Sequence, residues 1–162
     1  MTLGDLGNLG EFVGSIGVVV SLIYLAVQIR EQNRESRAAA IDSLAQQWAS
    51  FMSGLSASET LCDIYLRGLE DFDALSRNEK MRFTTVLSQA TQITESLYKH
   101  HRLGRLDAGM WEGFNTRMVD VFSHPGVKTW WRLRRHWFSP QIRGYFDEIV
   151  GRTNEATGYE SF

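Results

Sequence analysis

The residues that could do chemistry in this 162-residue chain are four histidines, one cysteine and a few clustered carboxylates. His100 and His101 are adjacent, so on a helix their side chains diverge by about 100° and cannot hold one metal ion together. His124 has one carboxylate at helical spacing, Asp120, and His136 has none. No metal-binding motif of the HExxH or ExxH kind occurs. We therefore expect no metal site, and histidines that are structural or solvent-exposed.

Neither the cysteine nor the carboxylates suggest a catalytic set. Cys62 is the only cysteine, which excludes an intrachain disulfide and suits a reducing compartment. Its apolar helical surroundings indicate a packed thiol. Glu70, Asp71 and Asp73 fit a solvated turn. Because GxSxG and phosphate-binding GK[ST] sequences do not occur either, we expect no enzyme, no catalytic residue and no cofactor.

The stretch KTWWRLRRHWFSPQIR, residues 128–143, mixes basic and aromatic residues and has no acid. It fits a core helix with a cationic outer face, a surface for anionic lipid or an acidic partner, or a site for single-stranded nucleic acid. Trp130, Leu133 and Trp137 share one helical face, which favours the core. Nucleic acid is not expected, because from Arg30 onward 17 basic residues face 17 acidic ones. The candidate lipid or partner contacts are Lys128, Arg132, Arg134 and Arg135.

The elements that would position these residues begin with an apolar segment. Phe12 to Ile29 is free of charge and as a helix would be roughly 27 Å long, close to the hydrocarbon thickness of about 30 Å. A signal peptide would carry basic residues before this run, and none is present. A buried helix of a soluble protein is the other alternative, but its glycines would each cost about 1 kcal/mol in water. We predict a transmembrane segment over residues 1–30.

The arginines predict the orientation of this segment. All 17 Lys and Arg lie at or after Arg30, and Arg34 and Arg37 follow closely. The positive-inside rule then places the N-terminus in the periplasm and the C-terminal domain in the cytoplasm, with the span in a bacterial inner membrane.

The same segment carries small residues at intervals of three and four. Small residues at this spacing allow helix backbones to approach closely, and the 3.5-residue period implies a left-handed crossing. Because one span has no second span in its own chain, the expected partner is another copy of this chain. The alternative is that these residues only avoid crowding. The predicted oligomer contacts are Gly7, Gly10, Gly14, Gly17 and Ser21.

The rest of the chain reads as helices. No segment alternates like a strand, so the predicted fold class is all-α, with about five helices in a cytoplasmic bundle over residues 31–152 and a mobile tail over 153–162. Ser58 and Asp107 are expected helix caps, and Ser76 with Glu79 forms a capping box. Pro125 suits the first position of a short helix that runs to about Phe138. The apolar positions in the bundle include Met52 and Met81, and a short helix is expected to end near Gly68.

Four stretches resemble an uncharacterised group of small bacterial proteins with one N-terminal membrane helix and a helical cytoplasmic domain. They are GEFVGSIGVVVSLIYLAVQIREQNR, LSRNEKMRFTTVL, LGRLDAGMWEGF and HPGVKTWWRLRRHWFSPQIRGYFDEIV, and the resemblance extends to about residue 150. It implies the membrane architecture and a bacterial origin. No established activity goes with that group, so the resemblance implies no site residues.

These observations favour an inner-membrane protein that self-associates and presents its bundle as a scaffold or sensor. One alternative is a small homo-oligomeric channel with the N-terminal helices around a pore. A third is a soluble helical oligomer that buries the glycine-rich helix. The expected partners are further copies of the chain, the lipid bilayer, and an acidic partner or anionic lipid.

Overall fold

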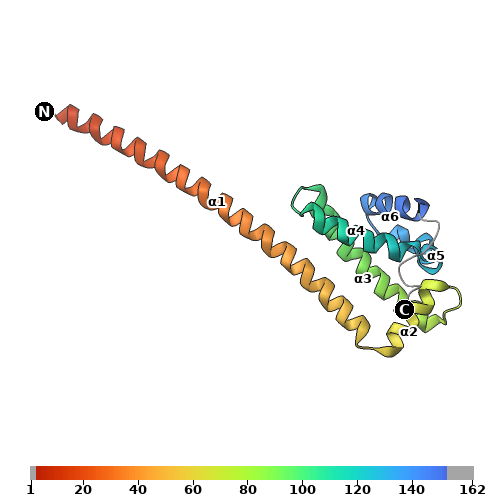
Figure 1. Cartoon of the computed structure of the whole chain (residues 1–162). Helices are drawn as coiled ribbons and strands as arrows, with labels where there is room; N and C mark the ends of the chain where they lie inside the picture. Colours follow the sequence, from red (N-terminus) through yellow and green to blue (C-terminus); the bar gives the residue numbers. More distant parts are fainter. Residues whose placement is uncertain (1–2, 153–162) are drawn as a thin grey trace. The chain divides into compact units, whose positions relative to one another are not determined.

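The structure, a computed structural model, describes the backbone of residues 3–152 and the side chains of that range except residues 3–11, 13 and 15. The described residues form helices and no strand, which confirms the predicted all-α class. The predicted tail, 153–162, lies outside them. The chain divides into two units, Met1–Asp42 and Ser43–Phe162. The elements, labelled in Figure 1, are α1 (Leu3–Ser56), α2 (Glu59–Glu70), α3 (Arg77–Arg102), α4 (Ala108–Ser123), α5 (Pro125–Arg134), a 3-10 turn (Arg135–Trp137) and α6 (Pro140–Arg152).

Helix α1 begins in the first unit and ends in the second, and no proline interrupts it. Every side chain described between Phe12 and Ala39 is exposed. Among the residues that the structure describes, no helix is both long and apolar enough to span a bilayer. The predicted span includes Val13 and Ser15, whose side chains lie outside the described part.

The starts of α2 and α3 confirm the predicted caps. The backbone N–H of Leu61 donates to the Ser58 hydroxyl at 3.2 Å. At α3 the capping box is complete, since Glu79 N–H donates to the Ser76 hydroxyl and Ser76 N–H donates to a Glu79 carboxylate oxygen at 2.8 Å. Both boundaries therefore follow from side chains that satisfy the first free N–H groups of a helix.

The connection from α3 to α4 also follows the sequence. Gly104 has φ of 62°, a left-handed conformation that other residues adopt at a cost, and α3 ends two residues before it. The Asp107 carboxylate then accepts hydrogen bonds from Gly109 N at 2.9 Å and Met110 N at 3.1 Å, which confirms it as the cap of α4.

The predicted helix from Pro125 to about Phe138 divides into two parts. Pro125 occupies the first turn as expected, but the α-helix ends at Arg134 and a 3-10 turn follows. Because a 3-10 turn advances about 120° per residue instead of about 100°, the side chains beyond Arg134 leave the face that an α-helix would give them.

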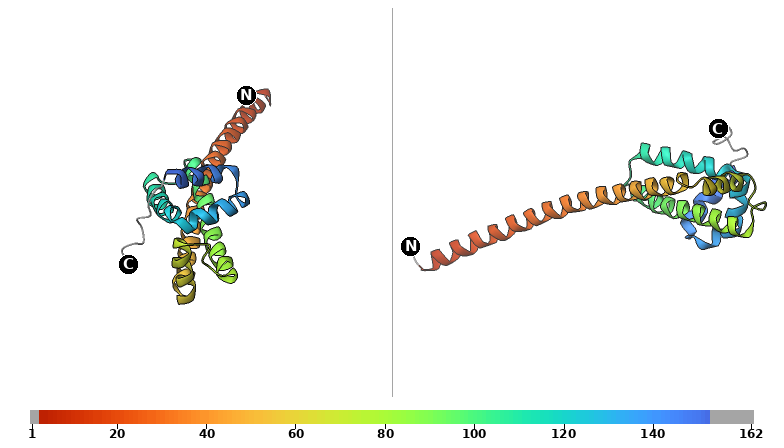
Figure 2. Two further views of the ribbon diagram at one scale, coloured as in Figure 1. Left: turned by 90° about the vertical axis from the view of Figure 1, so that its right-hand side faces the viewer. Right: turned by 90° about the horizontal axis from the view of Figure 1, so that it is seen from below.

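Aromatic side chains from α4, α5 and α6 form one part of the core of the second unit, and α2 and α3 contribute another part together with residues between them. Helix α5 contacts both α2 and α4, and α6 contacts α4 (Figure 2). The rings of Phe122 and Phe146 stack with centroids 3.9 Å apart, and Trp131 packs against both. The Trp131 indole N–H donates to the Asp147 carboxylate at 2.9 Å, which satisfies its polar atom.

Two glycines allow α2 and α5 to cross closely. A Cβ atom added at Gly126 would lie 2.9 Å from Phe72 N and nearer still to the carbonyl oxygen of Gly68. Gly68 itself is buried against the ring of Phe83. The short helix predicted over roughly 59–69 is confirmed as α2, which ends at Glu70, two residues after Gly68. The packing function of Gly68 is an addition to that prediction.

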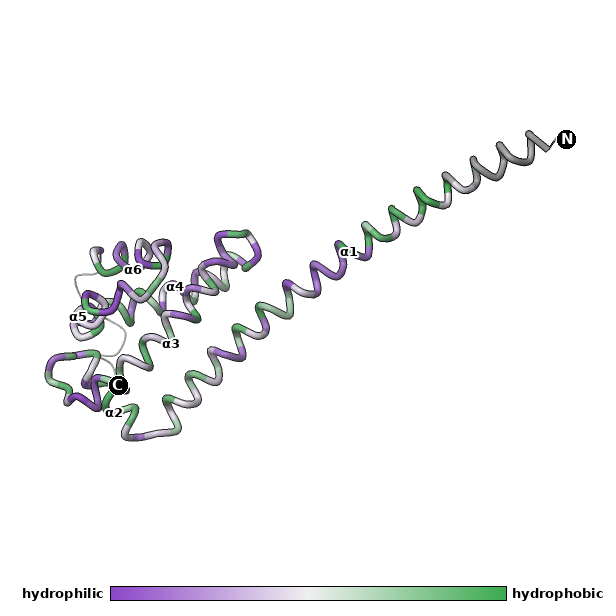
Figure 3. The backbone as a smooth tube through the Cα atoms, turned by 180° about the vertical axis from the view of Figure 1, so that it is seen from behind, coloured by the Kyte–Doolittle hydropathy of each residue, from purple (hydrophilic) through white to green (hydrophobic). Residues whose placement is uncertain are grey.

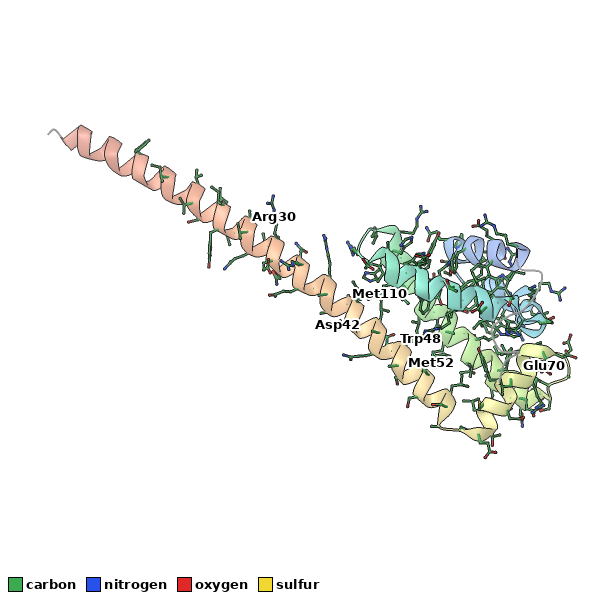
Figure 4. All side chains as sticks on the ribbon, in the orientation of Figure 1. Arg30, Asp42, Trp48, Met52, Glu70 and Met110 are labelled. Atoms are coloured by element: carbon green, nitrogen blue, oxygen red, sulfur yellow. The ribbon has the colours of Figure 1, made fainter. Side chains whose placement is uncertain are left out.

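The C-terminal part of α1, residues 43–56, belongs to the bundle. Leu44 and Phe51 are buried, and the Trp48 ring meets Phe114 of α4 edge-on at 5.1 Å. Trp48 and Met52 are labelled in Figure 4. Met52 is exposed, and so is Met81 of α3, which corrects their assignment to the apolar faces.

Candidate membrane and assembly surfaces

The first unit carries an apolar surface around the whole circumference of α1. Successive residues of a helix point about 100° apart, so the run from Val18 to Val20 and the run from Leu22 to Leu25 together cover every direction. Their exposed fractions lie between 50% and 62%. The exposed apolar side chains are Phe12, Ile16, Val18, Val19, Val20, Leu22, Ile23, Tyr24, Leu25, Val27 and Ile29. Figure 3 shows this part of the helix as mainly hydrophobic.

An apolar surface of this kind is costly in water. Covering one large apolar side chain contributes about 1.5 kcal/mol at the low end, so covering the set would contribute on the order of 15 kcal/mol. A patch of this size marks a region that contacts lipid or protein. The first unit supplies no second helix that could cover it, among the residues described.

Charged residues follow this surface directly. Arg30, Arg34 and Arg37 are exposed, and Arg34 lies 3.9 Å from Glu31 in a solvent-exposed ion pair. Such an exposed pair contributes little to stability in water. The apolar surface therefore ends at a basic margin.

The described part of the predicted oligomer contact, which we call the small-residue stripe, consists of Gly14, Gly17 and Ser21. No other part of the described chain occupies the space next to its two glycines. A Cβ added at Gly14 or at Gly17 would meet no atom within 4 Å. The Ser21 hydroxyl donates to the Gly17 carbonyl oxygen at 2.8 Å. This bond within the helix keeps the short Ser21 side chain close to its own backbone. Gly7 and Gly10, the other predicted contacts, lie outside the described side chains.

In the second unit the basic–aromatic stretch separates into a buried and an exposed set. Trp130 and Trp131 are buried in the core, and Phe138 joins them. Leu133 and Trp137 are exposed, so the interpretation that they share the core face with Trp130 is wrong. The 3-10 turn explains Trp137, because it rotates this residue outward and brings Phe138 inward.

The predicted contact arginines differ in their partners. Arg135 forms an ion pair with Asp147, the carboxylate that also accepts from Trp131. Arg132 donates to the Thr129 hydroxyl at 3.2 Å. The Arg134 guanidinium lies 5.0 Å from the centre of the Trp137 ring, in a cation–π contact. Lys128 is half-buried. The structure thus places Arg134 against the exposed Trp137 ring, and it joins Arg135 to the carboxylate that also binds the buried Trp131.

The histidines and carboxylates of the described part form no group of three that could hold a metal ion. His101 stacks on Trp111 with centroids 4.6 Å apart, and His124 is buried. Cys62 is a half-buried free thiol. Glu79 also forms an ion pair between helices, which the sequence pattern does not predict. It forms an ion pair with Arg67 at 2.6 Å, and Arg67 also pairs with Asp63.

The second unit also contains open clefts. One, of about 510 Å³, lies between the C-terminal part of α1, the start of α2 and α3, and is lined by Phe51, Leu61, Met81 and Arg82 among others. A 450 Å³ cleft next to α6 is lined by Tyr98, Lys99, Arg102 and Gln141 among others. Neither lining brings a nucleophile against a base in a hydrogen bond, so neither cleft provides the arrangement that covalent catalysis uses.

Tyr145 joins α6 to α4 through a hydrogen bond, since its hydroxyl donates to the Asn115 side-chain oxygen at 2.7 Å. Burial raises the pKa of the Tyr145 hydroxyl, and Tyr98 nearby adds to the shift.

Comparisons of the chain with protein family models, with curated proteins and with solved structures found no match.

Proposed function

We propose that this chain is a single-span protein of a bacterial inner membrane that self-associates and presents its helical bundle to the cytoplasm as a scaffold or sensor. The observation that carries the proposal is the exposed apolar surface around all of α1 between Phe12 and Ile29. Lipid chains can cover such a surface on every side, whereas a single protein neighbour covers one side. The N-terminus is then periplasmic, because the basic margin at Arg30 follows the span.

Extraction of the full chain from membranes tests the span. We expect the protein to remain with the membrane pellet in alkaline carbonate. Val20→Arg with Ile23→Arg should release it, since each arginine at mid-span costs about 2.5 to 3.5 kcal/mol. The control is Ala38→Arg with Ala39→Arg, which adds the same charge at two exposed residues outside the span. Release of the unmodified chain as a soluble oligomer would instead favour the alternative of a buried glycine-rich helix.

Self-association is proposed through the face of Gly14, Gly17 and Ser21. An added Cβ would meet open space at both glycines, so a second helix backbone can approach there. The channel alternative needs a polar stripe toward a pore. Ser21 contributes weakly to such a stripe, because its hydroxyl proton is donated to its own helix. This difference favours a closed helix contact over a water-filled pore.

A further inference from the structure

Trp137 differs from the other tryptophans of the chain. It is 55% exposed, whereas Trp130 and Trp131 are buried and the remaining two are half-buried. Leu133, one helical turn earlier, is also exposed, at 47%. The 3-10 turn that follows α5 turns Trp137 out of the core although Phe138 next to it is buried. Two large apolar side chains exposed within five residues of chain indicate a contact surface.

The charges around this pair indicate the chemistry of the contact. The Arg134 guanidinium lies over the Trp137 ring, and Arg132 is exposed on the same short helix. Neither arginine forms an ion pair within the described residues, whereas Arg135 pairs with Asp147. No acidic residue occurs in the sequence between Asp120 and Asp147. The stretch of chain that carries Trp137 is therefore basic, and it includes two exposed apolar side chains.

We infer that Leu133 and Trp137, with Arg132 and Arg134, form a site that rests on the anionic lipid headgroups of the membrane. Tryptophan prefers the interface between headgroups and acyl chains, and guanidinium groups pair with lipid phosphates. The inference depends on the proposed membrane span. Only residues 31–42, a part of helix α1 roughly 18 Å long, separate that span from the first residue of the bundle, so the chain itself keeps the bundle near the bilayer.

The inferred site is narrower than the contact that the sequence predicted. Arg135 is engaged by Asp147, so it is not a principal lipid contact. Lys128 and Arg134 are both half-buried, and Arg134 is kept because it contacts the exposed Trp137 ring. Leu133 and Trp137 are added to the site. An acidic protein would match the same charge, but the exposed indole stacked under an arginine suits a surface with both a charged and an apolar layer.

The test uses the full chain in vesicles whose phosphatidylcholine carries bromine near the headgroup end of the acyl chains, with or without phosphatidylglycerol. Bromine quenches nearby tryptophan emission. We expect quenching with the anionic lipid and its loss in Trp137→Phe. Arg132→Gln with Arg134→Gln should lower the docking equilibrium roughly 30-fold, since each arginine near an anionic surface contributes about a fivefold factor.

Two control variants match the site in exposure and charge. Met110→Ser removes an exposed apolar side chain from α4, and Arg102→Gln with Arg105→Gln removes two exposed charges elsewhere. In both controls the tryptophan emission should be quenched as strongly as in the wild-type chain. If carbonate retains the chain but its emission is not quenched, or if Trp137→Phe quenches as before, the lipid site is wrong while the span stands. If carbonate releases the chain, the proposed function itself fails.

Discussion

At the scale of single residues, Arg67 links α2 to α3 because it bonds one carboxylate in each helix. It bonds Asp63 within α2 and Glu79 at the start of α3, and Glu79 also completes the capping box. The hydrogen bond from Arg67, with smaller contributions from Ser76, lowers the pKa of Glu79 from 4.5 to about 2. The carboxylate form of Glu79 is therefore the one that the folded chain stabilises.

This shift predicts a dependence of stability on pH. A carboxyl group with a lowered pKa in the folded state stabilises the fold above its unfolded pKa, and this contribution is lost as the pH falls from about 4.5 toward 2. In Glu79→Gln the cap survives, because glutamine also suits this position. We expect a lower melting temperature than wild type at pH 7 and a difference that shrinks as the solution is acidified.

Thermal unfolding of the full chain by circular dichroism, in detergent and at several pH values, measures this difference. Glu70→Gln is the control, since Glu70, labelled in Figure 4, forms no ion pair within the described residues. A Glu79→Gln melting temperature that stays below wild type by the same amount at every pH would contradict the assignment.

A second prediction at this scale concerns the glycine crossing of α2 and α5. In Gly126→Ala the new methyl group would meet backbone atoms of Gly68 and Phe72, which cannot rotate away as a side chain could. Overpacking of this kind typically costs about 1 to 3 kcal/mol. Gly144→Ala on α6 meets nothing within 4 Å and should gain about 0.5 to 1 kcal/mol from helix propensity. Urea unfolding curves should therefore shift in opposite directions, and a shared direction would refute the close crossing.

At the scale of elements, the sequence predicts those features that depend on neighbours along the chain. The caps at Ser58, Ser76 and Asp107 bond N–H groups two or three residues away, so local pattern suffices to find them. The packing of Gly68 against Phe83 depends on a contact between helices, and no local pattern contains it. Trp137 was misplaced for a related reason, because α-helical periodicity does not hold through a 3-10 turn.

For a single helix, we predict that self-association depends on the small-residue stripe of α1. Gly14→Leu adds a side chain where an approaching helix would need space, and the expected cost is about 1 to 3 kcal/mol per site. The oligomer should dissociate or rearrange while the bundle stays helical. Val19→Leu is the control, since residue 19 points away from the face of Gly14, Gly17 and Ser21.

Oligomer mass in mild detergent, measured by light scattering, compares the two variants. Wild-type mass for Gly14→Leu together with an altered mass for Val19→Leu would place the contact on the opposite face. The proposed stripe would then have to be abandoned.

At the scale of the whole molecule, charge is distributed unevenly along a chain that is nearly neutral in sum. The formal net charge is −2, yet every Lys and Arg lies at or after Arg30. The apolar surface of α1 ends at this same residue. An apolar segment with basic residues on one side only has two inequivalent ends, so it favours one direction of insertion. In the proposed membrane protein, this direction decides which compartment the bundle and the inferred lipid site face.

The prediction at this scale is that the C-terminus of the chain faces the cytoplasm. Alkaline phosphatase fused after Phe162 should be inactive and a fused fluorescent protein should be bright, because both report a cytoplasmic C-terminus. Replacing Arg30, Arg34 and Arg37 by Gln, together with Asp5→Lys and Asn8→Lys, moves the excess of basic residues to the N-terminal side of the span. The phosphatase should then become active in part of the population.

A control variant removes three other basic charges, with Lys99→Gln, Arg102→Gln and Arg105→Gln, and should leave the phosphatase inactive. These three residues lie far along the chain from the span, and the positive-inside rule counts charges close to the membrane. Phosphatase activity in the unmodified fusion would show that the basic margin does not set the orientation, and the inferred lipid site would then face the wrong leaflet.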